Sequence, residues 1–127
     1  MIKTVLGNIA DGALGITLPH EHICCYSEYF YKMGCERYLD KALLARASIH
    51  YLKELKQRIG LCGFIDCTPV NIGRDIDLLK RVSHESGVHI IASAGFYYTR
   101  EPLLDKDPDY IAEYLASDAE KDRKSVV

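Results

Sequence analysis

Three short apolar runs alternate along the chain with longer stretches in which apolar residues recur at helical spacing. The runs cover residues 16–23, 63–68 and 88–95, and the helical stretches cover residues 39–59, 75–85 and 109–123. Consecutive strands joined by helices form right-handed βαβ units, because parallel neighbours need a long crossover connection. The alternation therefore predicts an α/β fold built on a parallel sheet.

Two further segments lie outside this alternation. Residues 2–8 and 13–18 are short apolar stretches separated by Asp11-Gly12, a strong turn signal, so we expect an antiparallel hairpin there. Residues 25–38 hold four tyrosines and a phenylalanine among polar residues, which indicates a long loop. The tyrosines of this loop either cover a pocket mouth or pack on the end of the sheet, and the sequence leaves both alternatives open.

Polar side chains gather where the predicted strands end. His20 and His22 lie near the end of the first run, residues 66–68 close the second, and residues 95–98 span the end of the third. Ligands of parallel α/β sheets bind outside the carboxyl ends of the strands. We therefore expect a functional site at this edge. His84 and His89 fall at the opposite end of the sheet and are not expected to contribute to it.

His20 and His22 are the strongest candidate ligands. In a regular strand, residues two apart share a face and lie about 6.5 Å apart at a rise of roughly 3.3 Å per residue. Two imidazoles at that spacing can converge on one divalent metal. The alternative is a pair of ordinary strand histidines, one buried and hydrogen-bonded and the other partly solvated. Two ligands also form only half of a metal centre.

The charge balance and the cysteines limit the partners and the compartment. Lys and Arg number 16 against 18 Asp and Glu, and no basic face is clustered, so we expect no nucleic-acid partner. No apolar run approaches a membrane span, and we expect a cytoplasmic protein that does not bind membranes. The five cysteines, an odd number with no C-x-x-C pair, indicate free thiols. We expect Cys62 and Cys67 to be small buried hydrophobic residues. Cys24 and Cys25 follow the histidines closely enough to be candidate ligands, but their spacing is not that of a zinc finger.

Residues 15–23 (GITLPHEHI), 64–66, 72–75, 78–79 and 87–97 (GVHIIASAGFY) together resemble the phosphotriesterase-related branch of the amidohydrolase superfamily. The resemblance runs in order from about residue 5 to residue 98. It implies a (β/α)8 TIM barrel with two divalent metals, usually zinc, at the strand carboxyl ends. It makes His20 and His22 the metal ligands from the first barrel strand. The family's other ligands, a carboxylated lysine or Glu, two histidines and an aspartate from later strands, have no matching positions in this sequence.

The resemblance also implies a reaction and a substrate pocket. A metal-activated hydroxide attacks a small-molecule ester, lactone or phosphotriester. Tyr97 matches a pocket position where phosphotriesterases carry Trp and lactonase-like members Tyr, so Tyr97 and the adjacent Tyr98 are candidate substrate-binding residues. This difference favours substrates smaller than bulky phosphotriesters.

Chain length restricts these expectations. A complete barrel takes about 250 residues, and the 127 residues present offer a hairpin and about three βα units. We therefore expect residues 1–127 to form an incomplete, amino-terminal portion of the barrel with little or no hydrolase activity alone. A homo-oligomer or a partner chain could complete the barrel, or the chain could be a non-catalytic α/β module. A thiol enzyme using Cys24 or Cys25 would lack the base it needs.

Three further polar residues lie near these strand ends. Arg74 and Asp75 are expected to cap and pair around the start of the helix at 75–85 rather than to touch substrate. Asp66 is evenly balanced between a structural role and a role in orienting a ligand.

Overall fold

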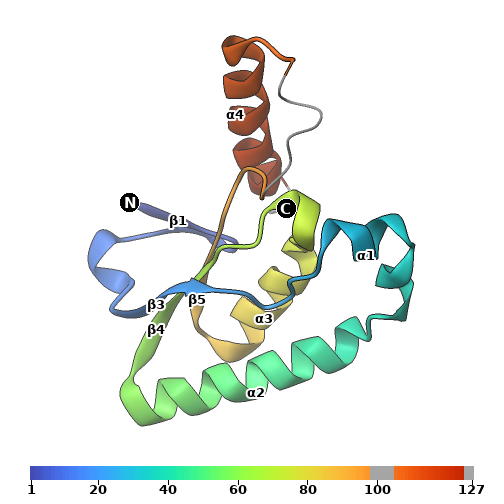
Figure 1. Cartoon of the computed structure of the whole chain (residues 1–127). Coiled ribbons are helices and arrows are strands. Elements are labelled where there is room, and N and C mark those ends of the chain that lie inside the picture. Colours follow the sequence, from blue (N-terminus) through green and yellow to red (C-terminus); the bar gives the residue numbers. More distant parts are fainter. Residues whose placement is uncertain (98–104, 125–127) are drawn as a thin grey trace.

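A three-stranded parallel sheet forms the centre of the molecule (Figure 1). The computed structural model describes residues 1–97 and 105–124. In the sheet, β3 (Ile16–Glu21) pairs with β4 (Leu61–Asp66), which pairs with β5 (His89–Ala92). The predicted order of βα units is confirmed, and all three strands present their carboxyl ends at the same edge.

Three long helices connect or follow these strands: α2 (Lys41–Ile59), α3 (Ile76–Ser86) and α4 (Pro108–Lys124). Asp40 and Asp75 cap the first two by accepting hydrogen bonds from backbone N–H groups three residues on. Gly60 and Gly87 end these helices in the left-handed conformation, at φ values of 73° and 68°. The helix boundaries therefore follow from capping residues visible in the sequence.

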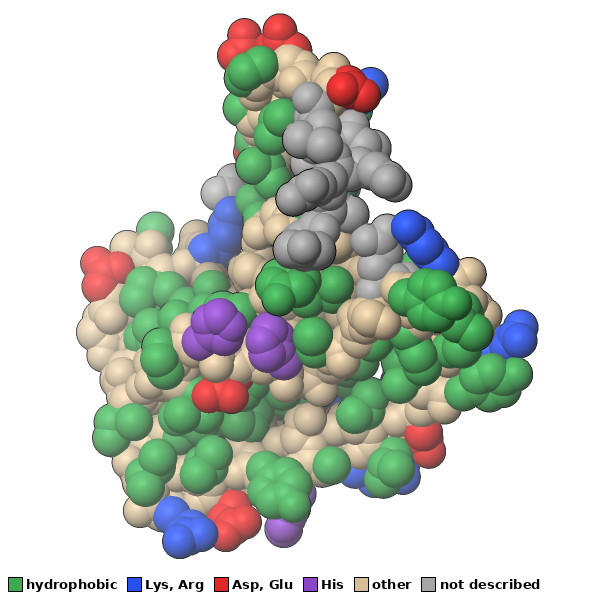
Figure 2. All heavy atoms as spheres, viewed as in Figure 1, with side chains coloured by type: hydrophobic (Ala, Val, Ile, Leu, Met, Phe, Trp, Pro, Cys, Tyr) green, Lys and Arg blue, Asp and Glu red, His purple; other side chains and the backbone are tan. Residues whose placement is uncertain are grey.

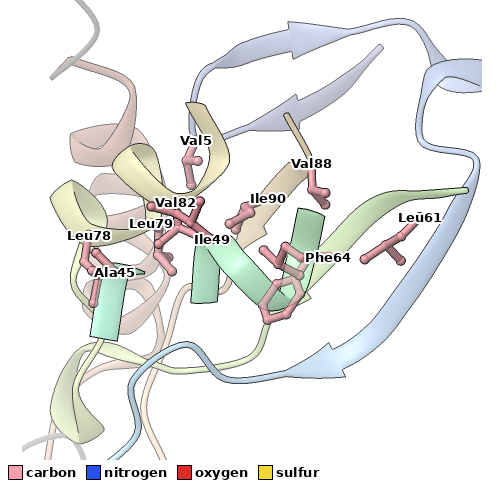
Figure 3. Close-up of a cluster of buried hydrophobic side chains, with 11 residues drawn as sticks. Val5, Ala45, Ile49, Leu61, Phe64, Leu78, Leu79, Val82, Val88 and Ile90 are labelled. Carbon is pink, nitrogen blue, oxygen red and sulfur yellow. The ribbon is translucent and has the colours of Figure 1, made fainter. Parts of the chain in front are cut away.

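The hydrophobic core lies between the sheet and the helices α2 and α3 (Figure 3). Phe64 and Ile90 lie opposite each other in register and are buried. Ile65 and Ile91 point to the other face, since side chains alternate along a strand, and they are only half-buried. The core itself contains Val5, Ala45, Ile49, Leu52, Leu61, Phe64, Leu78, Leu79, Val82, Val88 and Ile90. The helices thus cover one face of the sheet more fully than the other.

Helix α4 rises away from the sheet (Figure 1), and polar and aromatic contacts hold it. The Arg74 guanidinium donates two hydrogen bonds to the Asp118 carboxylate, at 2.9 and 2.6 Å, and both side chains are buried. The ring of Phe96 stacks on Tyr114, with centroids 5.2 Å apart. α4 is therefore docked through a charged pair rather than through the main core.

The amino-terminal hairpin forms earlier in the chain than expected. β1 (Ile2–Thr4) pairs antiparallel with β2 (Gly7–Ile9), and the predicted turn lies in a 3-10 turn, η1 (Asp11–Ala13). Gly7 adopts a φ of 120°, and the Thr4 hydroxyl donates to its carbonyl at 2.7 Å, which closes the earlier turn. Residues 16–18 instead join the parallel sheet, where they pair with β4. A hairpin exists as predicted, but its second strand was wrong.

The segment predicted as a long loop also contains regular structure. It forms α1 (Glu28–Lys32) and a second 3-10 turn, η2 (Cys35–Tyr38). The Ser27 hydroxyl accepts a hydrogen bond from the Phe30 N–H at 3.1 Å and so begins α1. The high tyrosine content favoured the interpretation of this segment as a loop, so the Ser27 cap was not predicted. Within the described residues, none of the helices has the length and apolarity that crossing a membrane requires.

Candidate metal centre

His20 and His22 lie side by side at the carboxyl end of β3. Their ring centroids are 5.4 Å apart with an interplanar angle of 72°, and both residues are exposed. Figure 2 shows a pair of neighbouring histidine side chains on the surface, with hydrophobic side chains around them. The two rings are therefore neither separated by the backbone nor sunk in the apolar core.

A bulge between Leu18 and Glu21 contains His20, so the regular alternation assumed from sequence does not hold locally. Leu18 pairs with Phe64 and Glu21 pairs with Asp66, which leaves β3 one residue longer than β4 between the two pairs. Pro19 lies in the extra stretch, and its lack of an N–H suits a bulge on an edge strand. The rings are neighbours even though the strand is irregular.

His22 is oriented by a hydroxyl from the next strand end. Its Nδ1 lies 2.8 Å from the Thr68 Oγ1, and Thr68 is buried. When Nδ1 carries the proton and donates it to this hydroxyl, Nε2 keeps a free lone pair for a ligand. The sequence placed Thr68 at the site edge but did not identify it as the partner of His22. Its position two residues after the buried strand is the signal that could have done so.

Asp66 holds this edge together through backbone groups. Its carboxylate accepts hydrogen bonds from the Ile23 N–H and the Thr68 N–H, each at 2.9 Å, and the side chain is fully buried. Its backbone carbonyl accepts from the Ser93 N–H at 3.0 Å. Asp66 therefore ties the ends of β3, β4 and β5 together, and it positions Thr68 and, through Thr68, His22.

The other histidines lie elsewhere. His89 begins β5 opposite Gly63, at the amino end of the sheet, and His50 and His84 are exposed on helices. Among residues 1–97 and 105–124, no group of three or more His, Cys, Asp or Glu side chains could hold a metal ion. The described residues thus bring together two imidazole ligands and their supporting hydrogen bonds.

Comparison with known proteins identifies the family. Residues 1–123 match the Phosphotriesterase family. The chain belongs to this family. It is 28% identical over 124 residues to the N-acetyltaurine hydrolase of Homo sapiens and 32% identical over 124 residues to that of Xenopus tropicalis, covering 76% of this chain and 35% of each relative. The chain thus spans about a third of the length of these phosphotriesterase-family relatives.

Solved structures of the family share the fold. A mutant of organophosphorus hydrolase superposes with a TM-score of 0.72 and 28% identity, over 88% of this chain and 33% of that chain. A second mutant, from Deinococcus radiodurans, gives 0.70 and 32% identity, over 76% and 29%. The hairpin and three βα units of this phosphotriesterase-family chain therefore correspond to part of a TIM barrel, as predicted.

Tyr97, which the resemblance to the family predicts to bind substrate, has an exposed side chain. Its backbone is fixed by the Asn71 side chain, which accepts from the Tyr97 N–H at 2.9 Å and donates to its carbonyl at 2.8 Å. Sequence analysis did not single out Asn71. Tyr98 lies outside the described residues.

The expected roles of Arg74 and Asp75 are partly met. Asp75 caps α3 and pairs with Lys41 at 2.6 Å. Burial alone would raise the pKa of Asp75, but the hydrogen bonds from Lys41 and from the Leu78 N–H outweigh it and lower the pKa. The Arg74 guanidinium binds Asp118 on α4, a partner that the sequence did not indicate. The partner was unpredictable because it lies 44 residues away.

The thiols near the histidines are poor ligands and nucleophiles. Burial raises the pKa of Cys24, and the Asp75 carboxylate raises it further. Burial and the Asp66 carboxylate raise the pKa of Cys25. Because the thiolate is both the nucleophile and the ligand, these shifts argue against a thiol enzyme at this edge.

Proposed function

We propose that this phosphotriesterase-family chain supplies the first two metal ligands, His20 and His22, of a metal-dependent hydrolase acting on a small-molecule ester, lactone or phosphotriester. The observation that carries the proposal is the pair of exposed imidazoles, with centroids 5.4 Å apart, at the carboxyl end of the first sheet strand. This is where parallel α/β folds bind ligands. Family membership supports the reaction class.

The donor set fits part of a divalent metal site. Imidazole nitrogen suits zinc and related metals, and the Thr68 hydroxyl gives His22 the outer hydrogen bond that metal-bound histidines usually have. A complete family site takes two metals and further ligands. A bound metal of this kind acidifies water and polarises the oxygen of the scissile bond.

The chain's own residues have three tasks in this proposal. Asp66 fixes the strand ends through the Ile23 and Thr68 N–H groups, and Thr68 sets the direction of the His22 ring. His20 and His22 offer nitrogen lone pairs at a solvent-accessible edge. Tyr97, and Tyr98 beside it, contact the substrate. Each task orients a group before substrate arrives, and such preorganisation lowers the barrier to reaction.

The substrate class rests on the family and on Tyr97. The named relatives hydrolyse an N-acetyl compound and organophosphorus compounds, which extends the candidate bonds to amides. Tyrosine in place of the tryptophan of phosphotriesterases favours a lactone or simple ester. The five cysteines are free thiols, which suits a cytoplasmic location.

We further propose that the 127-residue polypeptide alone has little or no turnover, because two ligands hold metal weakly and leave the metal pair incomplete. The remaining strands and ligands of a complete family barrel would have to come from outside residues 1–127. The second candidate function is a non-catalytic α/β module, which the small set of described ligands favours.

The test measures zinc-dependent hydrolysis of a lactone, a phenyl ester, N-acetyltaurine and a phosphotriester. The chain is assayed alone and after co-expression with the part of organophosphorus hydrolase that it does not match. We expect turnover only in the co-expressed complex, with loss of activity in His20→Ala and His22→Ala. A stable complex that holds zinc but has no activity on any of the four would favour the non-catalytic module. Zinc-dependent turnover by the chain alone would contradict the claim of inactivity.

A further inference from the structure

The Asn71 side chain binds the backbone of Tyr97 in the way that one strand binds another. Its Oδ1 accepts from the Tyr97 N–H at 2.9 Å, and its Nδ2 donates to the Tyr97 carbonyl at 2.8 Å. The amide thus satisfies both backbone groups of one residue 26 positions away. The side-chain amides of asparagine and glutamine carry an acceptor oxygen and a donor nitrogen on the same carbon, which matches the N–H and the carbonyl of one residue.

Asn71 itself lies in a turn that hydrogen bonds and close packing hold in place. It lies in a 3-10 turn, η3 (Val70–Ile72), in which the Ile72 N–H donates to the Pro69 carbonyl. The Ile72 carbonyl accepts from the Tyr26 N–H at 2.8 Å. Gly73, at a φ of 115°, then ends the turn, and the Tyr26 ring lies so close that a Cβ there would meet it at 2.8 Å. This packing fixes the direction in which Asn71 points.

The chain before Tyr97 is fixed at a second point. The Arg74 guanidinium donates to the Ser93 carbonyl at 2.7 Å, and its charge is balanced by Asp118. Between the two ties, Gly95 adopts a φ of 109°, a turn that only glycine makes without strain. Asn71 and Arg74, three residues apart, therefore hold the two ends of residues 93–97.

We propose that Asn71 is a positioning residue that fixes where Tyr97 stands at the carboxyl end of β5 and thereby sets which acyl group the substrate pocket accepts. The substrate half of this inference rests on the function proposed above. The positioning half does not, since it follows from the two hydrogen bonds alone. Tyr97 has an exposed side chain, and the two hydrogen bonds from Asn71 hold the backbone from which that side chain projects.

The first experiment measures amide hydrogen exchange at Tyr97 by NMR in the full chain. Asn71→Ala removes both bonds, and we expect exchange at this amide to rise roughly tenfold. Asn71→Asp keeps an acceptor for the Tyr97 N–H, so the rise should be less than about threefold. Asn8→Ala, at an exposed asparagine in β2, is the matched control and should change nothing. Unchanged exchange in Asn71→Ala, or an equal rise in Asn71→Asp, would overturn the positioning role.

The second experiment follows the Tyr97 ring. The chain is labelled with 3-fluorotyrosine, the Tyr97 resonance is assigned with Tyr97→Phe, and δ-valerolactone is added as the probe. We expect the resonance to move in the unmodified chain and in Asn8→Ala, and to need at least threefold more lactone in Asn71→Ala. A resonance that does not move in the unmodified chain would overturn the substrate half together with the proposed role of Tyr97. The exchange measurement would still decide the positioning half. If Asn71→Ala does not fold, Asn71→Asp decides the exchange result, with exchange as fast as in a free peptide as the contradicting outcome.

Discussion

The helix-covered face of the sheet and the carboxyl edge of its strands bury different kinds of side chain, apolar on the face and polar at the edge. Leu61, Val82 and Ile90 in the core are fully buried and apolar. At the carboxyl edge, Asp66 and Thr68 are buried just as deeply but are hydrogen-bonded to backbone and to His22. Burial in the first region excludes water from apolar surface, whereas burial in the second region fixes the direction of polar groups.

This difference indicates that the core supplies most of the stability and that the carboxyl edge supplies the candidate functional groups. Burying one large aliphatic side chain contributes about 1.5–3 kcal/mol. A single internal hydrogen bond contributes about 0.5–1.5 kcal/mol net, and the exposed side chains of His20 and His22 bury little apolar surface. We therefore expect core substitutions to unfold the chain and edge substitutions to change what it binds.

The largest expected effect comes from the core. Ile90→Ala should lower the free energy of unfolding by about 2–5 kcal/mol, because it leaves a cavity opposite Phe64. Ile59→Ala, at an exposed residue, is the matched control and should change it by less than about 0.5 kcal/mol. Urea unfolding followed by circular dichroism measures both. Equal effects of the two substitutions would contradict the assignment of the core.

A substitution at the buried edge should affect both properties. Asp66→Ala leaves the Ile23 and Thr68 N–H groups without their acceptor, which should cost about 2–4 kcal/mol of unfolding free energy. It should also release Thr68 from His22, so the NMR signals of the His22 ring should shift in the folded protein. Asp66→Asn keeps one acceptor and should lose less stability. A folded Asp66→Ala chain with an unchanged His22 ring would contradict the link between the two residues.

The ion pair between Lys41 and Asp75 is expected to matter less and to depend on pH. The pKa of Asp75 is lowered in the folded chain, so its contribution is present above the unfolded pKa of about 3.9 and is lost as the pH falls through the folded value. Lys41 is exposed, which limits the pair to about 1 kcal/mol or less. Lys41→Met should therefore destabilise the chain more at pH 7 than at pH 2. Lys53→Met on the same helix is the control, and an equal loss at both pH values would contradict the pairing.

The sequence predicted one of these regions better than the other. The strand and helix order and the cap at Asp75 were predicted from local rules, and the structure confirms them. The cap at Asp40 and the terminal glycines Gly60 and Gly87 obey the same rules. The second strand of the hairpin was predicted wrongly. A hydrogen bond between Thr4 and Gly7 closes an earlier turn, although Asp11-Gly12 is the stronger turn signal in the sequence. The partners Thr68, Asn71 and Asp118 were missed because each meets its target through contacts at least 26 residues apart.

The measurement that tests the central claim most directly is a zinc titration of the full chain followed by the NMR signals of the histidine rings. We expect the His20 and His22 signals to shift together, with no effect on His50, His84 or His89. His20→Ala should leave stability unchanged, whereas His22→Ala should cost about 0.5–1.5 kcal/mol, because it removes one hydrogen bond to Thr68. Either substitution should abolish the shift of the remaining ring. Zinc that moves all five histidines alike, or that moves neither His20 nor His22, would contradict the assignment of this pair as a metal half-site.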